Sequence, residues 1–260
     1  GNELWSFGGK CGGDPFANTG YCNDVVKVDL LSWKWNQYCP AGQASTDWCN
    51  SSDTSVVWLD GPGPPSRYAH ASAAHGANFY VFAGESAAGT LSDLWVLDTA
   101  ASPLRWRQIK ARGTNPPALS APRVAVVGET LFLFGGKDSR GIYGNAVYKL
   151  DLTTEVWTSD LHVASKSRPP GRQYHTMMHY QDYLVVMGGG IRNPATGEKT
   201  FWNDLWVYSL DTEQWLKLKT INEDTGLEQP MVRWCHTLMV GDDGTFYIHG
   251  RSSNEGFDND

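Results

Sequence analysis

Three histidines occupy the same place in a repeated pattern, each of them three residues after an arginine. The histidines are His70, His175 and His236, and the arginines are Arg67, Arg172 and Arg233. Histidine is the most frequent general base of enzymes, so the recurrence raises the question of acid–base chemistry. A catalytic residue written three times would be unusual, whereas a structural hydrogen bond formed once per repeat explains all three copies. We therefore expect these histidines to hold a scaffold together.

Cysteines form the second group that could do chemistry. Four of the five lie near the start of the chain, at Cys11, Cys22, Cys39 and Cys49. Thiols can form disulfides, bind zinc or remain reduced. The gaps lack the close Cys-x-x-Cys spacing that is usual for zinc, so we favour disulfides. Cys11–Cys22 and Cys39–Cys49 is the preferred pairing among three connectivities, since each bond would close one long loop.

Asn50 directly follows the last of these cysteines, and Asn50-Ser51-Ser52 matches the acceptor sequence for N-glycosylation. Disulfides persist only in an oxidising compartment. Together the two features predict an extracellular or cell-surface location, reached through the secretory pathway. Reduced cysteines and an unmodified Asn50 would instead indicate a cytosolic protein. The fifth cysteine, Cys235, lies between Trp234 and His236 and is interpreted as a small buried residue rather than a nucleophile.

These residues belong to a unit of about fifty residues that is written four times, with a fifth copy begun. Each copy has an apolar run that ends in a pair of small residues or in His-Gly. The pairs are Gly8-Gly9, Ala83-Gly84, Gly135-Gly136, Gly188-Gly189 and His249-Gly250. A five-residue step and a tryptophan follow, as in Asp24–Asp29–Trp35, Asp93–Asp98–Trp106, Ala146–Asp151–Trp157 and Asp204–Ser209–Trp215. A fixed period indicates repeated small structural units rather than one large core.

Each copy is interpreted as four short strands, named a to d. Strand a contains the Arg-x-x-His segment, strand b runs into the glycines, strand c follows the aspartate and strand d surrounds the tryptophan. We expect Asp29, Asp98 and Asp151 to bond turn backbone, and the periodic tryptophans to pack between sheets. Antiparallel four-stranded sheets around an axis form a β-propeller, so the fold class is all-β. The expected blades are 1–60 (partial), 61–112, 113–166, 167–225 and 226–260 (partial).

The double glycine, the downstream tryptophan and the period resemble the kelch repeat, over essentially the whole chain. This resemblance implies a kelch-type β-propeller with one blade per repeat. The third copy departs from the pattern, with Leu119 and Pro122 where arginine and histidine would fall, and a less regular first strand is expected there. The chain begins and ends inside a repeat, so we expect a piece of a larger propeller.

Some kelch-like propellers are enzymes, including copper-radical oxidases similar to galactose oxidase and a sialic acid epimerase. The oxidases need a copper site of two histidines and two tyrosines, and no such set can be assigned here. His75 and His179 could approach the central channel as a metal pair, but a structural place in strand a is favoured. We find no nucleophile elbow, phosphate loop or zinc-protease motif. We therefore predict no catalytic residues, no cofactor and no metal.

Composition narrows the class of partner. The formal net charge is −7, and the lysines and arginines are scattered, which argues against nucleic acid because phosphate binding needs clustered basic residues. No stretch approaches the roughly 18 apolar residues of a membrane-spanning helix.

The longest connections carry aromatic residues that do not follow the period. Trp48, Trp58 and Trp202 lie in or near them, and exposed aromatics can stack on a sugar or anchor a protein. The b–c and d–a connections emerge on the same side of an antiparallel blade. We therefore place the binding face on 10–23, 36–66 and 190–203.

The sequence favours an extracellular interaction or structural module that binds a protein or a glycan through its long loops and could form part of a larger assembly. One alternative is a secreted propeller enzyme with an active site partly outside this chain. Another alternative is a cytosolic kelch adaptor.

Overall fold

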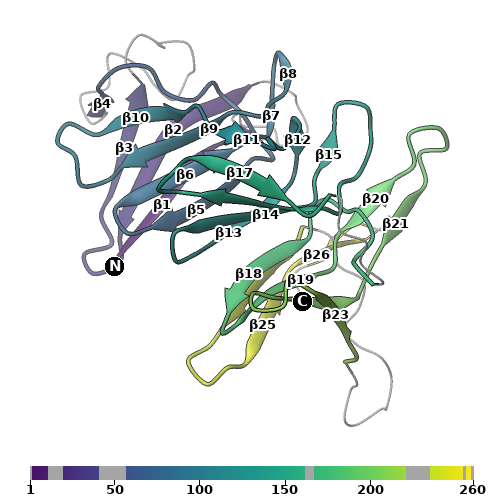
Figure 1. Ribbon diagram of the computed structural model, residues 1–260. Helices are drawn as coiled ribbons and strands as arrows, with labels where there is room; N and C mark the ends of the chain where they lie inside the picture. Colours follow the sequence, from purple (N-terminus) through teal and green to yellow (C-terminus); the bar gives the residue numbers. More distant parts are fainter. Residues whose placement is uncertain are drawn as a thin grey trace. The chain divides into compact units, whose positions relative to one another are not determined.

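The computed structural model describes residues 2–10, 20–40, 57–161, 167–220, 235–253 and 256–258, which form strands, turns and loops (Figure 1). These described segments contain no helix, and therefore none that is long and apolar enough to cross a membrane. The predicted all-β class is confirmed.

Four sheets follow one another along the chain. The first has the order β1 (Glu3–Lys10), β2 (Tyr21–Asp29), β3 (Trp35–Pro40) and β4 (Val57–Leu59). The second contains β5 (Ala71–His75), β6 (Asn78–Phe82), β9 (Leu94–Asp98) and β10 (Arg105–Ile109). The third contains β13 (Arg123–Val127), β14 (Thr130–Phe134), β16 (Val147–Asp151), β17 (Val156–Ser159) and the short β11 (Arg112–Gly113). The fourth contains β18 (Thr176–Tyr180), β19 (Tyr183–Met187), β22 (Leu205–Ser209) and β23 (Trp215–Leu218).

Short strands occupy the connections and the last repeat. Three hairpins are β7 (Glu85–Ser86) with β8 (Gly89–Thr90), β20 (Gly190–Arg192) with β21 (Lys199–Phe201), and β24 (Thr237–Val240) with β25 (Phe246–His249). A fourth hairpin joins β26 (Arg251–Ser253) and β27 (Gly256–Asp258). The two-residue strands β12 (Leu119–Ser120) and β15 (Lys137–Asp138) complete the set. The second, third and fourth sheets each have the predicted a–b–c–d order, with antiparallel pairing between neighbours.

The chain divides into two compact units, which are described separately. The first unit contains residues 1–110 and 117–120, and the second contains residues 111–116 and 121–260. In the first unit, Phe7 and Val25 of the first sheet pack against Val81, Leu97 and Trp106 of the second sheet. Burial of such side chains, at about 25 cal/mol per Å² of apolar surface, is what holds adjacent sheets together.

The second unit repeats this packing between its own sheets. Phe134 and Val147 of the third sheet contact Val186, Trp206 and Trp215 of the fourth sheet. In the second, third and fourth sheets, strand b has four consecutive buried residues, so both of its faces are buried. This explains why the strand b sequences are continuous apolar runs without alternation.

The periodic tryptophans were expected to pack between sheets; Trp106 and Trp215 do so, and Trp157 is buried. Trp106, Trp157 and Trp215 are at most 7% exposed. Trp35 is 63% exposed, and the expectation is wrong for this residue. Trp35 lies in the first sheet, and no described residue of its unit forms a further sheet over that side chain.

Strand a begins later than the sequence pattern suggested. β5, β18 and β24 each start at the residue after the repeated histidine, so the Arg-x-x-His segment precedes the strand. The residue before each histidine lies in the left-handed region, with φ of 50°, 54° and 59° at Ala69, Tyr174 and Cys235. This conformation turns the chain out of the sheet. The third copy has the same turn at Ala121, with φ of 52°, and a regular five-residue strand β13, so the expected irregularity is wrong.

The repeated aspartates bond turn backbone, as predicted. Asp29 Oδ1 accepts hydrogen bonds from the backbone N–H groups of Leu31 (2.8 Å) and Ser32 (2.9 Å). Asp98 and Asp151 bond the second and third residues that follow them in the same way. These backbone bonds hold the pKa of Asp29 and Asp151 below the ordinary value.

Candidate functional site

Of the three repeated arginines, Arg67 and Arg172 have a structural role, and Arg233 lies outside the described residues. Arg172 is fully buried, and its Nη1 and Nη2 donate to Oδ1 (2.6 Å) and Oδ2 (2.9 Å) of Asp204. Nη1 also donates to the Gly188 carbonyl (2.8 Å), and Nε donates to the Pro170 carbonyl (3.1 Å). Each arginine therefore joins the entry to strand a, the end of strand b and the start of strand c.

The first unit contains the same arrangement. Arg67 is fully buried and bonds both carboxylate oxygens of Asp93 at 2.7 Å. Burial alone would raise the pKa of Asp93 and Asp204, but the hydrogen bonds and charge of the arginines outweigh it and hold both values below the ordinary one. The third copy has Leu119 and Ala146 at these two registers, so it carries neither charge.

The repeated histidines pack against the preceding sheet. His175 is fully buried, and its ring meets the ring of Phe134 edge to face, with centroids 5.5 Å apart. His70 meets Phe7 in the same way at 5.4 Å. A Cβ placed on Gly135, where φ is +73°, would lie 2.4 Å from Cε1 of His175, so glycine is required at this approach. His236 Nε2 lies 3.1 Å from Thr176 Oγ1, a hydrogen bond of the predicted structural kind.

His175 makes the protein sensitive to acid. Burial, followed by the charge of Arg123, lowers the pKa of His175 well below 6.5, so the folded protein holds it neutral. Below about pH 6.5 the unfolded chain binds a proton there that the folded chain does not, and stability falls by up to about 1.4 kcal/mol per pH unit. We expect His175→Phe to flatten the loss of unfolding free energy between pH 6.5 and 5, measured by urea titration. An unchanged slope would contradict this assignment.

The predicted cysteine and glycosylation sites fall largely outside the described residues. Cys11, Trp48, Cys49 and Asn50 are among the residues that the structure does not describe. Cys22 lies in β2, and Cys39 lies in β3, where it is fully buried and contacts Trp58. The pairing Cys11–Cys22 and Cys39–Cys49 therefore stays a prediction. Cys235, expected to be buried, is exposed because it occupies the turn before strand a.

Trp202 is close to the predicted face but serves the scaffold as well. Its ring covers the guanidinium of Arg172, with Cζ 4.8 Å from the ring centroid, and its backbone N–H donates to the Gly189 carbonyl (2.9 Å). A cation–π contact of this kind shields the buried ion pair from water. Trp58, in β4, is partly buried. Trp58 and Trp202 thus each pack against a buried residue of their own unit, Cys39 and Arg172 respectively.

Two connections in the second unit are joined through Tyr143. Its hydroxyl donates to the Arg192 carbonyl (3.0 Å) and accepts from the Arg192 backbone N–H (2.9 Å). Arg192 belongs to the β20–β21 hairpin, the b–c connection of the fourth sheet, and Tyr143 belongs to the b–c connection of the third (Figure 1). The hairpin exposes Arg192 and Lys199 to solvent. Sequence reasoning identified this loop but not the tyrosine that fixes it, since Tyr143 follows no period.

The first unit has an aromatic group on its corresponding connections. The rings of Tyr21 and Tyr68 stack with centroids 4.9 Å apart, and Lys10 Nζ lies 4.9 Å from the Tyr68 centroid. The Tyr68 hydroxyl donates to the Glu85 carboxylate. These residues were also missed from sequence. The sequence signal that could have indicated this aromatic group is the position of Tyr68 directly after the repeated Arg67.

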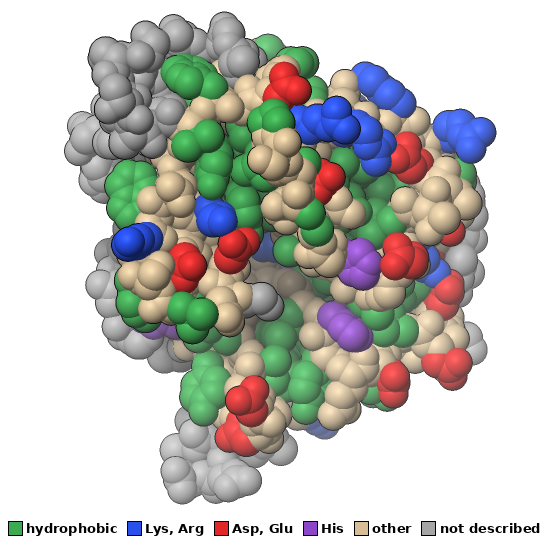
Figure 2. Space-filling view, turned by 90° about the vertical axis from the view of Figure 1, so that its left-hand side faces the viewer, with side chains coloured by type: hydrophobic (Ala, Val, Ile, Leu, Met, Phe, Trp, Pro, Cys, Tyr) green, Lys and Arg blue, Asp and Glu red, His purple; other side chains and the backbone are tan. Residues whose placement is uncertain are grey.

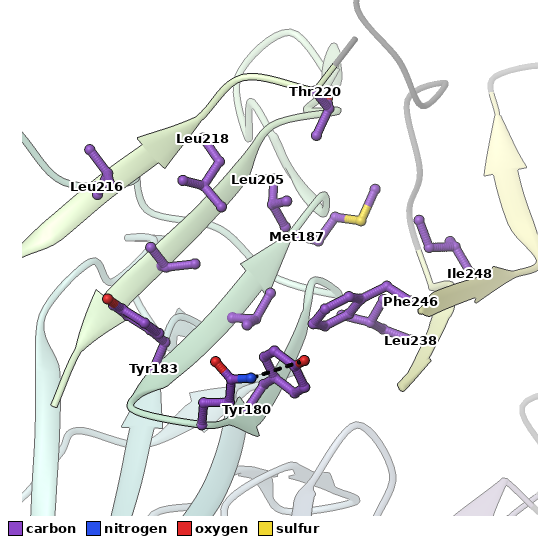
Figure 3. Close-up of a pocket in the computed structure, with 13 residues that line it drawn as sticks. Tyr180, Tyr183, Met187, Leu205, Leu216, Leu218, Thr220, Leu238, Phe246 and Ile248 are labelled. Carbon is purple, nitrogen blue, oxygen red and sulfur yellow. Dashed lines mark hydrogen bonds between the residues drawn. The ribbon is translucent and has the colours of Figure 1, made fainter. Parts of the chain in front are cut away.

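An apolar groove of 490 Å³ lies within the second unit, between the fourth sheet and the β24–β25 hairpin (Figure 3). Tyr180 and Phe246 meet edge to face at 5.0 Å on one side, while Leu216 and Leu218 lie on β23. Gln181 Nε2 donates to the Tyr180 hydroxyl at 3.2 Å. The rest of the lining is mostly apolar, so the groove offers mainly packing surface, and its described lining contains no histidine, lysine or carboxylate.

Charged side chains are mixed on the face that Figure 2 shows, and metal ligands are not grouped within the described residues. On the face that Figure 2 shows, basic side chains are interrupted by acidic and apolar ones. Among the residues that the structure describes, no group of three or more His, Cys, Asp or Glu could hold a metal ion. His179 instead has its Nε2 2.6 Å from the Gln181 carbonyl.

Comparison with known proteins identifies relatives of the whole chain. The leucine-zipper-like transcriptional regulator 1 homolog of Drosophila melanogaster is 27% identical over 263 residues, which cover 98% of this chain and 24% of that protein. Kelch domain-containing protein 3 of Bos taurus is 24% identical over 222 residues, covering 83% of this chain and 54% of that protein. The chain thus spans about a quarter to a half of the length of these relatives.

These relatives correct the predicted location. A protein named as a transcriptional regulator matches nearly the whole chain, which points away from an extracellular or cell-surface place. The prediction was wrong because it depended on cysteines and an Asn-Ser-Ser sequence whose compartment the sequence does not reveal. The glycosylation at Asn50 and the disulfides lose the support of a secretory pathway. One relative is named as a transcriptional regulator and the other as a kelch domain-containing protein, and neither name is that of an enzyme, in line with the prediction from the sequence.

A family model, described as the KLHDC2/KLHL20/DRC7 kelch-repeats domain, matches residues 1–158 and again residues 102–260. The two matches overlap and together cover the chain. They agree with the repeated four-stranded sheets, the buried Arg–Asp pairs and the glycine pairs described above. The chain therefore belongs to this kelch-repeat family of β-propellers.

Proposed function

We propose that the chain is the partner-binding kelch module of a cytosolic adaptor, and that a protein partner docks on its b–c connections. The observation that carries this proposal is the link between Tyr143 and the backbone of Arg192. It fixes two neighbouring connections to each other while the β20–β21 hairpin leaves Arg192 and Lys199 exposed. Loops held in place by a rigid scaffold bind without a large ordering cost.

Most of the repeated polar residues form contacts inside the scaffold, so few of them are left to bind a partner. The buried arginines satisfy aspartates, the buried histidines pack on phenylalanines, and the periodic aspartates bond their own turns. The side chains of the β20–β21 hairpin, in contrast, are mostly exposed. The relatives support an adaptor role, since one is named as a transcriptional regulator.

The proposal can be tested by shortening one connection. Residues 191–200 are replaced by Asn-Gly, a two-residue turn that suits an antiparallel hairpin. We expect at least a tenfold loss of binding to protein partners captured by the unaltered chain, because the exposed hairpin is removed while the sheet remains. Quantitative mass spectrometry of captured proteins is the measurement.

The matched control alters a c–d turn, which lies at the end of a sheet opposite to its b–c connection. Thr153 and Thr154 lie in the c–d turn of the third sheet, and both are replaced by serine. This variant should keep its partners. If the shortened hairpin retained every partner that the control retains, the b–c face would be excluded as the docking surface.

A further inference from the structure

The end of strand d in the fourth sheet carries two positive charges that depart from the repeat. Lys217 and Lys219 are the second and fourth residues after the repeated Trp215, and both are exposed. The three earlier copies have at most one charged residue at these two places. At the second place they have Gln37, Gln108 and Ser159, and at the fourth place they have Cys39, Lys110 and Leu161. The fourth copy therefore concentrates charge where the earlier copies do not.

Strand alternation puts both lysines on one face of the sheet. Lys217 pairs with Trp206 of β22, so its side chain lies on the same face as those of Trp206 and Asp204. Leu218 points to the other face, toward the apolar groove (Figure 3). A separate cavity of 240 Å³ lies within the second unit at this end of β22 and β23. The polar residues of its described lining are Asn203, Asp204, Lys217, Lys219 and Thr220.

Asp204, the carboxylate in this lining, has its counter-charge from another residue. Its two oxygens accept hydrogen bonds from Arg172, and Oδ2 also accepts one from Trp206 Nε1 (2.7 Å). Burial raises the pKa of Asp204, but the hydrogen bonds and charge of Arg172 outweigh it, and the charge of Lys217 adds to the lowering. Lys217 thus lies near a pair that is already complete. Within the described segments, neither Lys217 nor Lys219 forms an ion pair.

The first two copies show what the scaffold requires at the second place. In the first copy, Gln37 Nε2 donates to Asp24 Oδ2 at 2.7 Å. In the second copy, Gln108 Oε1 accepts from Lys110 Nζ at 2.5 Å. A neutral amide is therefore sufficient there. The two lysines of the fourth copy instead bring together positive charges that repel each other and that no further carboxylate of the described lining offsets, an arrangement that favours a bound anion.

We propose that Lys217 and Lys219, with the amide of Asn203 and the hydroxyl of Thr220, bind a phosphoryl group in this cavity. A phosphoryl group carries a charge of about −1.5 to −2 at pH 7 and three acceptor oxygens, so it can satisfy both ammonium groups at once. A carboxylate carries a single charge, and its planar pair of oxygens suits the fork of an arginine better than two ammonium groups. The inference goes beyond the proposed docking face, because a phosphorylated chain and a free phosphate compound both carry this group.

The test starts with inorganic phosphate as the probe and with acetate at the same ionic strength as its carboxylate match. Binding to the full chain near neutral pH is followed by NMR of the backbone amides of residues 217–220. We expect a saturable shift with phosphate and at least tenfold weaker binding of acetate, because acetate carries less charge. N-acetyl-phosphoserine methylamide then presents the same group on a peptide, with its unphosphorylated form as control. Tighter binding of this peptide than of phosphate identifies a phosphorylated chain as the source, and any other order identifies a free phosphate compound.

Variants separate this site from general charge effects. Lys217→Gln gives the fourth copy the residue that the first two copies have, and it should weaken phosphate binding at least tenfold, whereas Lys217→Arg should keep most of the affinity. The matched control is Lys110→Gln, which removes the lysine at the register of Lys219 in the second sheet and should change nothing. Unaltered backbone spectra away from the substitution show that each variant is folded.

Three results would overturn the inference: no saturable shift with phosphate, acetate binding as tight as that of phosphate, or equal weakening by Lys110→Gln. The chain with the shortened hairpin keeps Lys217 and Lys219, so it should still bind phosphate. Its loss or retention of protein partners therefore decides the docking face independently of this site.

Discussion

Replacing Arg172 with leucine is expected to lower the free energy of unfolding by about 3 to 5 kcal/mol. The change leaves the carboxylate of Asp204 largely buried, with one bond from Trp206 Nε1 (2.7 Å) but without its counter-charge. It also removes the bond from Arg172 to the Gly188 carbonyl, so the end of strand b loses its link to strand c. Urea unfolding, followed by tryptophan fluorescence, measures the loss.

Two further variants make this prediction specific. Arg140→Leu removes an arginine whose side chain is 75% exposed. Its buried partner Asp138 keeps the bonds from the backbone N–H groups of residues 140 and 142, so we expect a loss within about 1 kcal/mol. The double change Arg172→Leu with Asp204→Ala reproduces the third copy, which has Leu119 and Ala146 at these registers. It should recover a large part of the loss, because no buried charge remains unpaired. A double variant less stable than Arg172→Leu alone would contradict this account.

The scaffold could be predicted because its chemistry repeats. Four spacings that agree across copies place the strands, the glycine pairs and the turn aspartates, and structural histidines follow from the same recurrence. Register alone did not reveal that Arg172 and Asp204 are partners, since they are 32 residues apart and the contact depends on how strands b and c align. The joint absence of both residues in the third copy was a signal of pairing that could have been used.

The candidate site could be predicted only in part because it consists of departures from the repeat. Periodicity says which residues are scaffold, and it gives no distances between the residues that are left. Tyr143 lies in an irregular connection, and its partner atoms are backbone atoms of Arg192, which no sequence pattern encodes.

Replacing Trp215 with alanine should also destabilise the second unit by about 3 to 5 kcal/mol. Trp215 is 7% exposed, and its ring lies 4.9 Å from Phe134 of the preceding sheet and 5.1 Å from Tyr208 of its own. Removing it opens a cavity at the junction of two sheets, which the fixed backbone of both sheets cannot close. Hydrogen exchange of the β14 and β19 amides reports the loss within this unit.

Two controls test whether burial, rather than residue type or position in the strand, causes the effect. Leu216 is the next residue of β23 and is 59% exposed, so Leu216→Ala should cost less than about 1 kcal/mol. Trp35 holds the same place in the first copy but is 63% exposed, and Trp35→Ala should have a similarly small effect. If Trp35→Ala were as damaging as Trp215→Ala, the first sheet would need a covering surface that the described residues of its unit do not provide. The exposure of the Trp35 side chain described above would then be wrong.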